Sequence, residues 1–126
     1  EAILVSLAHD VLEVEEEDQL NPLGAISGSG PAYYFYFTEQ LVAYAISAGF
    51  DEEDAQLLAR QTLLGAAKIL EANPDDTARD WREKVTSKKG TTEQAILSFQ
   101  KDKLDTIVKR AIGKAEKRSK ELGKAS

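Results

Sequence analysis

The sequence predicts an all-α domain, a helical bundle in which one short strand stub near the N-terminus is the single candidate exception. Apolar residues recur at helical spacing along most of the chain, and the helical stretches are bounded by capping residues, glycines and prolines. A length of 126 residues limits the chain to one domain, and 42% hydrophobic residues are enough for a core. No fixed-period repeat is visible, which argues against a helical repeat array.

The N-terminal region is the least regular part of the chain. Glu1–Asp10 predicts the last turns of an amphipathic helix, whose apolar side would carry Ile3, Leu4, Leu7 and Ala8. Val11–Val14 is a short run typical of a strand, and the acidic residues Glu15–Asp18 predict a solvated helix start.

The motif Ser27-Gly-Ser-Gly-Pro-Ala-Tyr33 predicts the start of the next helix, over residues 31–49. Ser29 or Gly30 would be the N-cap, with Pro31 at the first helical position, and Gly49 suits the C-terminal stop. The apolar residues of this helix lie nearly all round its circumference, so it should be buried on most faces. In a chain of this size that predicts a homodimer, because a monomer would leave a large apolar patch exposed.

The remaining elements are also helical. A helix is predicted from near Asp51, with acidic residues in its first turn, to about Ala72. After it we expect an acidic turn, a short helix holding the only tryptophan, and two further helices: Pro74–Thr77, Ala78–Lys84, 92–100 and Leu104 to about Leu122.

The most informative stretch is Val85–Thr92, with the sequence VTSKKGTT. Three hydroxyl residues and a glycine crowd a turn that opens a helix: Thr86, Ser87, Thr92 and Gly90. Unpaired N–H groups and the positive end of the macrodipole make such a turn suitable for a carboxylate or a phosphate. The alternative is an ordinary cap, in which Thr91 or Thr92 is the N-cap and Glu93 or Gln94 favours the first turn.

Composition excludes several classes of function. A net charge of −6 argues against a general nucleic-acid binder, and no apolar run approaches the ~20 residues that a membrane span needs. The absence of cysteine fits a cytoplasmic protein, and a single histidine, His9, argues against a histidine metal site or a serine–histidine triad. We therefore expect no bound metal. The chain has no methionine, even at position 1, and is expected to begin at a processing site or inside a longer protein.

No stretch of the chain predicts a nucleotide-binding loop. Gly28-Ser-Gly30 lacks the third glycine of the dinucleotide fingerprint, because position 33 is tyrosine, and the flanking residues are not those of a loop between a strand and a helix. We therefore expect no cofactor-binding residue in this chain.

Three motifs together resemble the C-terminal half of pyrroline-5-carboxylate reductase: Ser27–Tyr33, Gln61-Thr-Leu-Leu-Gly-Ala-Ala67 and Val85–Thr92. The resemblance runs from residue 1 to 122. It implies that residues 1–126 are a C-terminal dimerisation and substrate-binding domain, lacking the N-terminal Rossmann domain. It also implies an all-α bundle that interleaves with its twin across a two-fold axis, with higher oligomers left open.

The resemblance further implies a function in proline biosynthesis. The whole enzyme would reduce 1-pyrroline-5-carboxylate, a small imino acid, to L-proline with NADPH or NADH, and this chain alone would be inactive. The matching positions for the substrate carboxylate are Ser87, Gly90, Thr91 and Thr92, and Thr92 is the expected catalytic residue beside the imine nitrogen. Lys88-Lys89 stands where the family usually has Pro-Gly. The two lysines could attract an anion or reshape the turn.

Two alternative classes remain at this point. The chain could be the helical dimerisation module of a related protein with lost or altered catalysis, or an unrelated helical adaptor. A strand followed by G-x-G-x-x-G upstream of Glu1 would favour the reductase.

Overall fold

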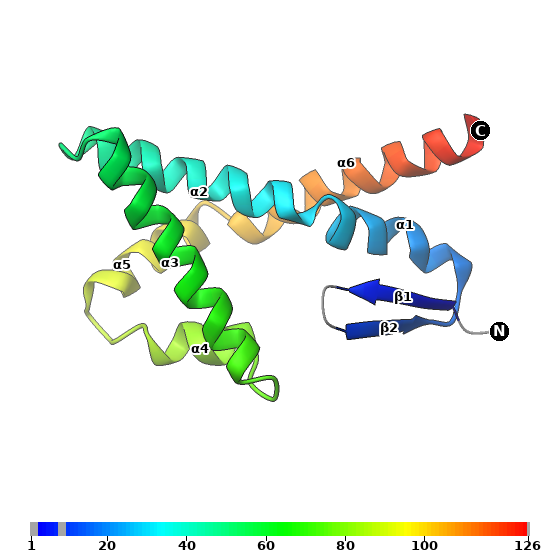
Figure 1. Cartoon of the computed structure of the whole chain (residues 1–126), viewed down its shortest axis with the longest axis horizontal. Coiled ribbons are helices and arrows are strands. Elements are labelled where there is room, and N and C mark those ends of the chain that lie inside the picture. The colour runs from blue at the N-terminus through cyan, green and yellow to red at the C-terminus, as the bar shows by residue number, and fades with distance from the viewer. Residues whose placement is uncertain (1–2, 8–9, 126) are drawn as a thin grey trace. The chain divides into compact units, whose positions relative to one another are not determined.

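The computed structural model describes residues 3–7 and 10–125, which are mostly helical (Figure 1). The elements follow in the order β1 (Ile3–Leu7), β2 (Asp10–Val14), the 3-10 turn η1 (Glu17–Gln19), α1 (Leu20–Leu23), the π-helical turn η2 (Gly24–Gly28), α2 (Gly30–Ser47), α3 (Glu52–Ala72), α4 (Ala78–Lys84), α5 (Thr91–Lys101) and α6 (Leu104–Ala125). The expected helical fold is confirmed. The chain divides into two compact units, one running to Tyr33 and resuming at Lys103, the other comprising Tyr34–Asp102.

The N-terminus forms a β-hairpin instead of a helix end. β1 and β2 pair antiparallel, with Ile3 opposite Val14 and Leu7 opposite Asp10. The strand expected at Val11–Val14 is confirmed, whereas the helix predicted for Glu1–Asp10 is wrong over the described residues; Ala8 and His9 lie outside them. The apolar run at residues 3–5 is compatible with helix or strand, and the adjacent β2 decides because it supplies the backbone partners.

Helical backbone leads into α2 without a fresh N-cap. Ser29 has helical dihedral angles (φ −91°, ψ −17°), and its N–H reaches back five residues to the Gly24 carbonyl at 3.1 Å. The predicted cap at Ser29 or Gly30 is therefore wrong, and α2 begins at Gly30 with Pro31 as its second residue. Because Pro31 has no N–H and its ring crowds the preceding turn, a widened π turn before it is a stable solution.

The first unit is held together around this π turn. The Tyr33 hydroxyl donates to the Ala25 carbonyl at 2.7 Å, and Ala25 is buried. α6 is tied to α1 by the Ser119 hydroxyl, which donates to Asn21 Oδ1 at 3.0 Å. α6 starts at Leu104 as predicted and continues three residues beyond the expected end at Leu122.

The turn between α2 and α3 follows the predicted signals. Gly49 has a positive φ of 105°, and the N–H groups of Phe50 and Gly49 bond to the carbonyls of Ala45 and Ile46. This is the Schellman arrangement that glycine favours at a helix end. Asp51 then caps α3, accepting from the Asp54 N–H at 2.8 Å.

The core of the second unit is small. Val42, Ala55 and Ala59 are buried where α2 faces α3, and Ala45 packs against them. Small alanine side chains let the two helices approach closely, and the Phe37 and Phe99 rings add a tilted contact with centroids 6.1 Å apart. Other large side chains of α2 stay exposed in the single chain: Tyr34, Phe35, Tyr36 and Tyr44. A single copy therefore does not bury α2 on most faces.

α4 has the predicted bounds, Ala78–Lys84, and a capping box formed by Thr77 and Asp80 starts it. Asp80 N–H donates to the Thr77 hydroxyl at 3.0 Å, and the Thr77 N–H donates to Asp80 Oδ2 at 2.9 Å. The backbone and hydroxyl bonds from Thr77, with smaller contributions from Lys84 and Arg79, hold the pKa of Asp80 below its usual value.

The Asp80 capping box predicts a pH dependence of stability. The pKa of Asp80 is lower in the folded than in the unfolded chain. Its ionised carboxylate therefore stabilises the fold fully at pH values above the unfolded pKa of about 3.9, and this stabilisation is lost as the pH falls through the folded pKa. Asp80→Asn keeps an acceptor but does not titrate. We expect the difference in melting temperature between wild type and this variant to be constant above pH 5 and to shrink toward pH 3. A constant difference throughout that range would contradict the assignment.

Candidate functional site

The stretch predicted to hold an anion connects α4 to α5 and is called here the 87–92 turn. Gly90 N–H donates to the Ser87 carbonyl at 3.1 Å, so Lys88 and Lys89 are the central residues of a β-turn. Lys89 has a φ of +60°, and a positive φ at this position is the mark of a type II turn. The turn therefore has the conformation that Pro-Gly favours, although two lysines occupy it.

Gly90 is the N-cap of α5, and a side chain at this position would force Ser87 to move. A Cβ atom at this position would lie 2.4 Å from Ser87 Oγ and 3.1 Å from the Ser87 carbonyl oxygen. Thr91 and Thr92 are the first two residues of the helix, so the prediction that one of them is the N-cap is wrong. The cap is supplied by backbone geometry and by Glu93, whose Oε1 accepts the Lys89 N–H at 3.0 Å.

The start of α5 presents hydrogen-bond donors without partners. Within the described chain, nothing accepts from the N–H groups of Thr91, Thr92 and Glu93, and no hydrogen bond engages the hydroxyls of Ser87, Thr91 and Thr92. Ser87, Thr91 and Thr92 are exposed. Three free amides at the positive end of an 11-residue helix can bind a carboxylate.

The four residues expected to bind substrate therefore lie together: Ser87, Gly90, Thr91 and Thr92. Thr86 does not belong with them, because its hydroxyl donates to the Arg82 carbonyl at the end of α4. Sequence reasoning treated Glu93 as a residue that merely favours the first turn. The sequence shows that Glu93 follows Lys89 by four residues, but it does not show that Lys89 has a positive φ, which is what makes the contact between them possible.

A shallow groove of about 270 Å³ runs beside the 87–92 turn, between α4 and α5. Its walls combine charged, polar and aliphatic side chains: Arg82, Glu83, Thr86, Lys88, Glu93, Ile96, Leu97 and Gln100. Basic and acidic groups are equal in number here, so the groove by itself does not select an anion.

Gly90→Ala is expected to impair ligand binding more than folding. Alanine tolerates the φ of −87° at this position, so the main conflict is the contact between its Cβ and Ser87 Oγ, which must rotate away; its approach of 3.1 Å to the Ser87 carbonyl oxygen is tight but needs only a small shift. We expect at least a fivefold higher Kd for a small carboxylate ligand and a melting temperature within about 3 °C of wild type, since a serine rotamer change costs about 1 kcal/mol. An unchanged Kd would show that the Ser87 hydroxyl takes no part in binding.

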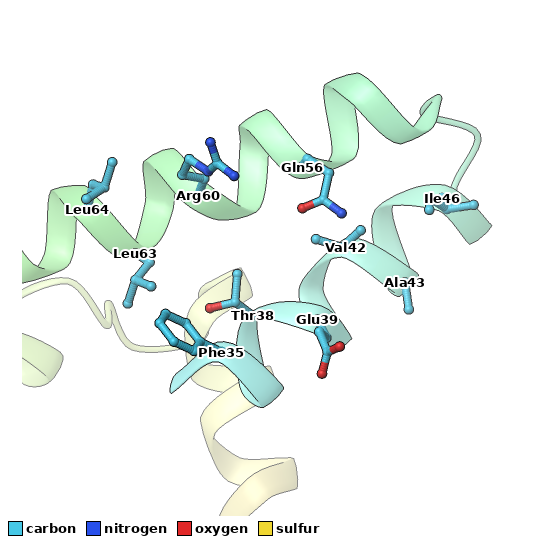
Figure 2. A pocket seen from close by; sticks show the side chains of 10 residues that line it. All are labelled: Phe35, Thr38, Glu39, Val42, Ala43, Ile46, Gln56, Arg60, Leu63 and Leu64. Carbon is cyan, nitrogen blue, oxygen red and sulfur yellow. The ribbon is translucent and has the colours of Figure 1, made fainter. Parts of the chain in front are cut away.

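A larger groove, of about 670 Å³, lies between α2 and α3 (Figure 2). Apolar side chains from both helices dominate its walls, including Phe35, Val42 and Leu63, while Glu39, Gln56 and Arg60 contribute polar groups. Such a large apolar depression next to exposed aromatic residues is typical of a surface that another polypeptide covers.

The described residues hold no group of three or more histidine, cysteine, aspartate or glutamate side chains that could bind a metal ion. No helix in that part of the chain has the length and apolar character required to cross a membrane.

The fold and site define a class of protein: a mostly helical domain with an uncovered apolar face and a hydroxyl-rich turn at a helix N-terminus. The chain belongs to the pyrroline-5-carboxylate reductase dimerisation family, whose model matches residues 17–122. The resemblance inferred from the three sequence motifs is thereby confirmed.

Individual relatives agree with this family. The chain is 42% identical over 123 residues to a pyrroline-5-carboxylate reductase of Vibrio alginolyticus, covering 98% of this chain and 45% of the relative. It is 38% identical over 119 residues to the Pseudomonas aeruginosa protein of the same name, covering 94% of this chain and 43% of that protein. The chain thus spans less than half the length of these curated relatives.

Two solved structures of pyrroline carboxylate reductases also resemble this chain over less than half of their own length. A pyrroline-5-carboxylate reductase from Coxiella burnetii superposes with a TM-score of 0.81 at 41% identity, covering 86% of this chain and 40% of that one. The Plasmodium falciparum pyrroline carboxylate reductase with NADP bound gives a TM-score of 0.79 at 28% identity, with coverage of 86% and 41%.

Proposed function

We propose that this chain is the substrate-side half of a reductase that converts 1-pyrroline-5-carboxylate to L-proline with NADPH or NADH, in the cytoplasm. The observation that carries the proposal is the set of free amides and hydroxyls at the start of α5, in a chain of the pyrroline-5-carboxylate reductase dimerisation family. The names of the relatives support the reaction.

The residues of the 87–92 turn suit a small cyclic imino acid. Its carboxylate would accept hydrogen bonds from the free N–H groups of Thr91 and Thr92 and from the Ser87 hydroxyl. The Thr92 hydroxyl can both donate and accept, so it would orient or protonate the imine nitrogen beside the carboxylate. Gly90 permits this arrangement because a side chain there would displace Ser87 Oγ.

A nicotinamide cofactor would bind to a part of the protein other than this chain. Gly28 ends the π turn η2 and Gly30 begins α2, so these glycines do not form a phosphate-binding loop between a strand and a helix. The cofactor supplies hydride when it is bound; this chain binds and orients the imine.

A homodimer is part of the proposal, and a higher oligomer is compatible with it. The groove between α2 and α3 and the exposed aromatic residues of α2 provide an apolar surface for a second copy. The family description names dimerisation, which supports this use of the surface.

The test compares the full-length protein with residues 1–126 alone. The full-length dimer should form L-proline from 1-pyrroline-5-carboxylate while oxidising NADPH or NADH, and the isolated chain should show neither activity nor cofactor binding below about 1 mM. A full-length dimer without this activity would favour the alternative, a helical dimerisation module with lost or altered catalysis. Saturable cofactor binding by residues 1–126 would refute the division of roles.

A further inference from the structure

We propose that Glu93 is a positioning residue that holds Lys89 in its left-handed conformation and so orients the free amides of the 87–92 turn. The substrate named below rests on the proposed function, whereas the contact between Glu93 and Lys89 does not.

The left-handed conformation of Lys89 has a steric cost that a hydrogen bond can offset. A φ of +60° is sterically disfavoured for lysine, because its Cβ approaches the following carbonyl oxygen, and glycine is the residue that adopts it freely. The support comes from four residues ahead, where Glu93 Oε1 accepts the Lys89 N–H at 3.0 Å. A hydrogen bond to a carboxylate is stronger than one between neutral groups.

The Glu93 contact also separates occupied amides from free ones. Lys89 N–H is bonded to Glu93, and Gly90 N–H is bonded to the Ser87 carbonyl. The next three N–H groups, of Thr91, Thr92 and Glu93, have no acceptor in the described chain. If Lys89 relaxed to a negative φ, the chain direction entering Gly90 would change, and with it the direction of these donors.

The surroundings of Glu93 suit a fixed side chain. Glu93 is half-buried and lines the small groove with Ile96 and Leu97. No ion pair to Glu93 is present among the described residues, although Lys88 and Lys89 precede it by only five and four residues. The carboxylate is therefore directed to a backbone amide rather than to an ammonium group.

For Glu93→Ala, electrostatics alone and the loss of the contact with Lys89 predict opposite changes in substrate affinity. Removing a negative charge beside an anion site should strengthen the binding of a carboxylate substrate. Loss of the orienting contact should weaken it. In the full-length enzyme we therefore expect Glu93→Ala to raise KM for 1-pyrroline-5-carboxylate about tenfold with a smaller change in kcat, and Glu93→Gln, which keeps the acceptor oxygen, to recover most of the affinity.

Glu83→Ala is the matched control. Glu83 lines the same groove and carries the same charge, but it pairs with Arg79 and does not touch the backbone of the 87–92 turn. Its removal should leave KM unchanged or slightly lower. If Glu93→Ala lowers KM to the same extent as Glu83→Ala, Glu93 acts only through its charge and the proposal is overturned.

The decisive comparison repeats Glu93→Ala in the Lys89→Gly background. Glycine adopts a positive φ without support, so Glu93→Ala should change KM less than twofold there. A tenfold rise in both backgrounds would mean that Glu93 acts on the substrate or on helix stability and not on Lys89, and would overturn the proposal.

Hydrogen exchange separates this proposal from the proposed function. In the full-length protein the Lys89 amide should exchange at least tenfold faster in Glu93→Ala than in wild type, with or without activity. If the wild-type protein does not reduce the imine, the proposed function fails while faster exchange still supports the role of Glu93. Equal exchange rates would overturn it even in an active enzyme.

Discussion

Thr92→Ala in the full-length protein is expected to lower kcat/KM by about 1.5–3 kcal/mol, or roughly 10- to 150-fold, because under the proposed function it removes a hydrogen bond to the reacting imine. The melting temperature should change little. Thr92 is the second residue of α5 and not its N-cap, and its hydroxyl makes no hydrogen bond within the described chain. The kinetic loss should therefore exceed any loss of stability.

Two matched variants sharpen the Thr92 measurement. Thr92→Ser keeps the hydroxyl and should retain most of the activity, whereas Thr91→Ala removes the neighbouring hydroxyl from the same helical turn and should affect KM more than kcat. Steady-state kinetics with 1-pyrroline-5-carboxylate and thermal unfolding of all three variants provide the comparison. Normal kinetics together with a clearly lower melting temperature would assign Thr92 a structural role only.

Phe35→Asp should weaken self-association of the full-length protein by at least about 2–4 kcal/mol, or 30- to 1,000-fold, as expected for an aromatic residue at the centre of an interface. Phe35 is 65% exposed in the single chain and lines the groove between α2 and α3. An aspartate there would be desolvated without a partner when a second copy covers the groove. Sedimentation equilibrium from nanomolar to micromolar concentration measures the effect.

Val11→Asp is the control for Phe35→Asp. Val11 lies on β2 and is 64% exposed, so the two substitutions remove similarly exposed apolar side chains and add the same charge. We expect Val11→Asp to leave the dimer intact. Equal dissociation in the two variants, or a stable wild-type monomer at micromolar concentration, would show that the α2–α3 groove is not the interface.

The sequence by itself determined the elements whose boundaries are set by neighbouring residues. The stop at Gly49, the start of α3 next to Asp51, the end of α3 at Ala72 and the whole of α4 all appear where predicted. Each depends on contacts within four or five positions: a glycine at positive φ, a side chain capping the amide three residues ahead, or a reciprocal capping box. The family was also inferred from the sequence, on three short motifs, and the family model matches residues 17–122.

The tertiary structure decided the features that depend on a partner or on one backbone angle. The run at residues 3–5 became a strand because β2 pairs with it, and the start of the Ser27–Tyr33 motif ends a π turn, with helix before it as well as after it, instead of forming an N-cap. At the 87–92 turn the sequence showed hydroxyls and lysines, but not the left-handed Lys89 or its bond to Glu93. Those features leave the amides of Thr91 and Thr92 free, because the turn is closed by Gly90 and Glu93 and not by a threonine cap.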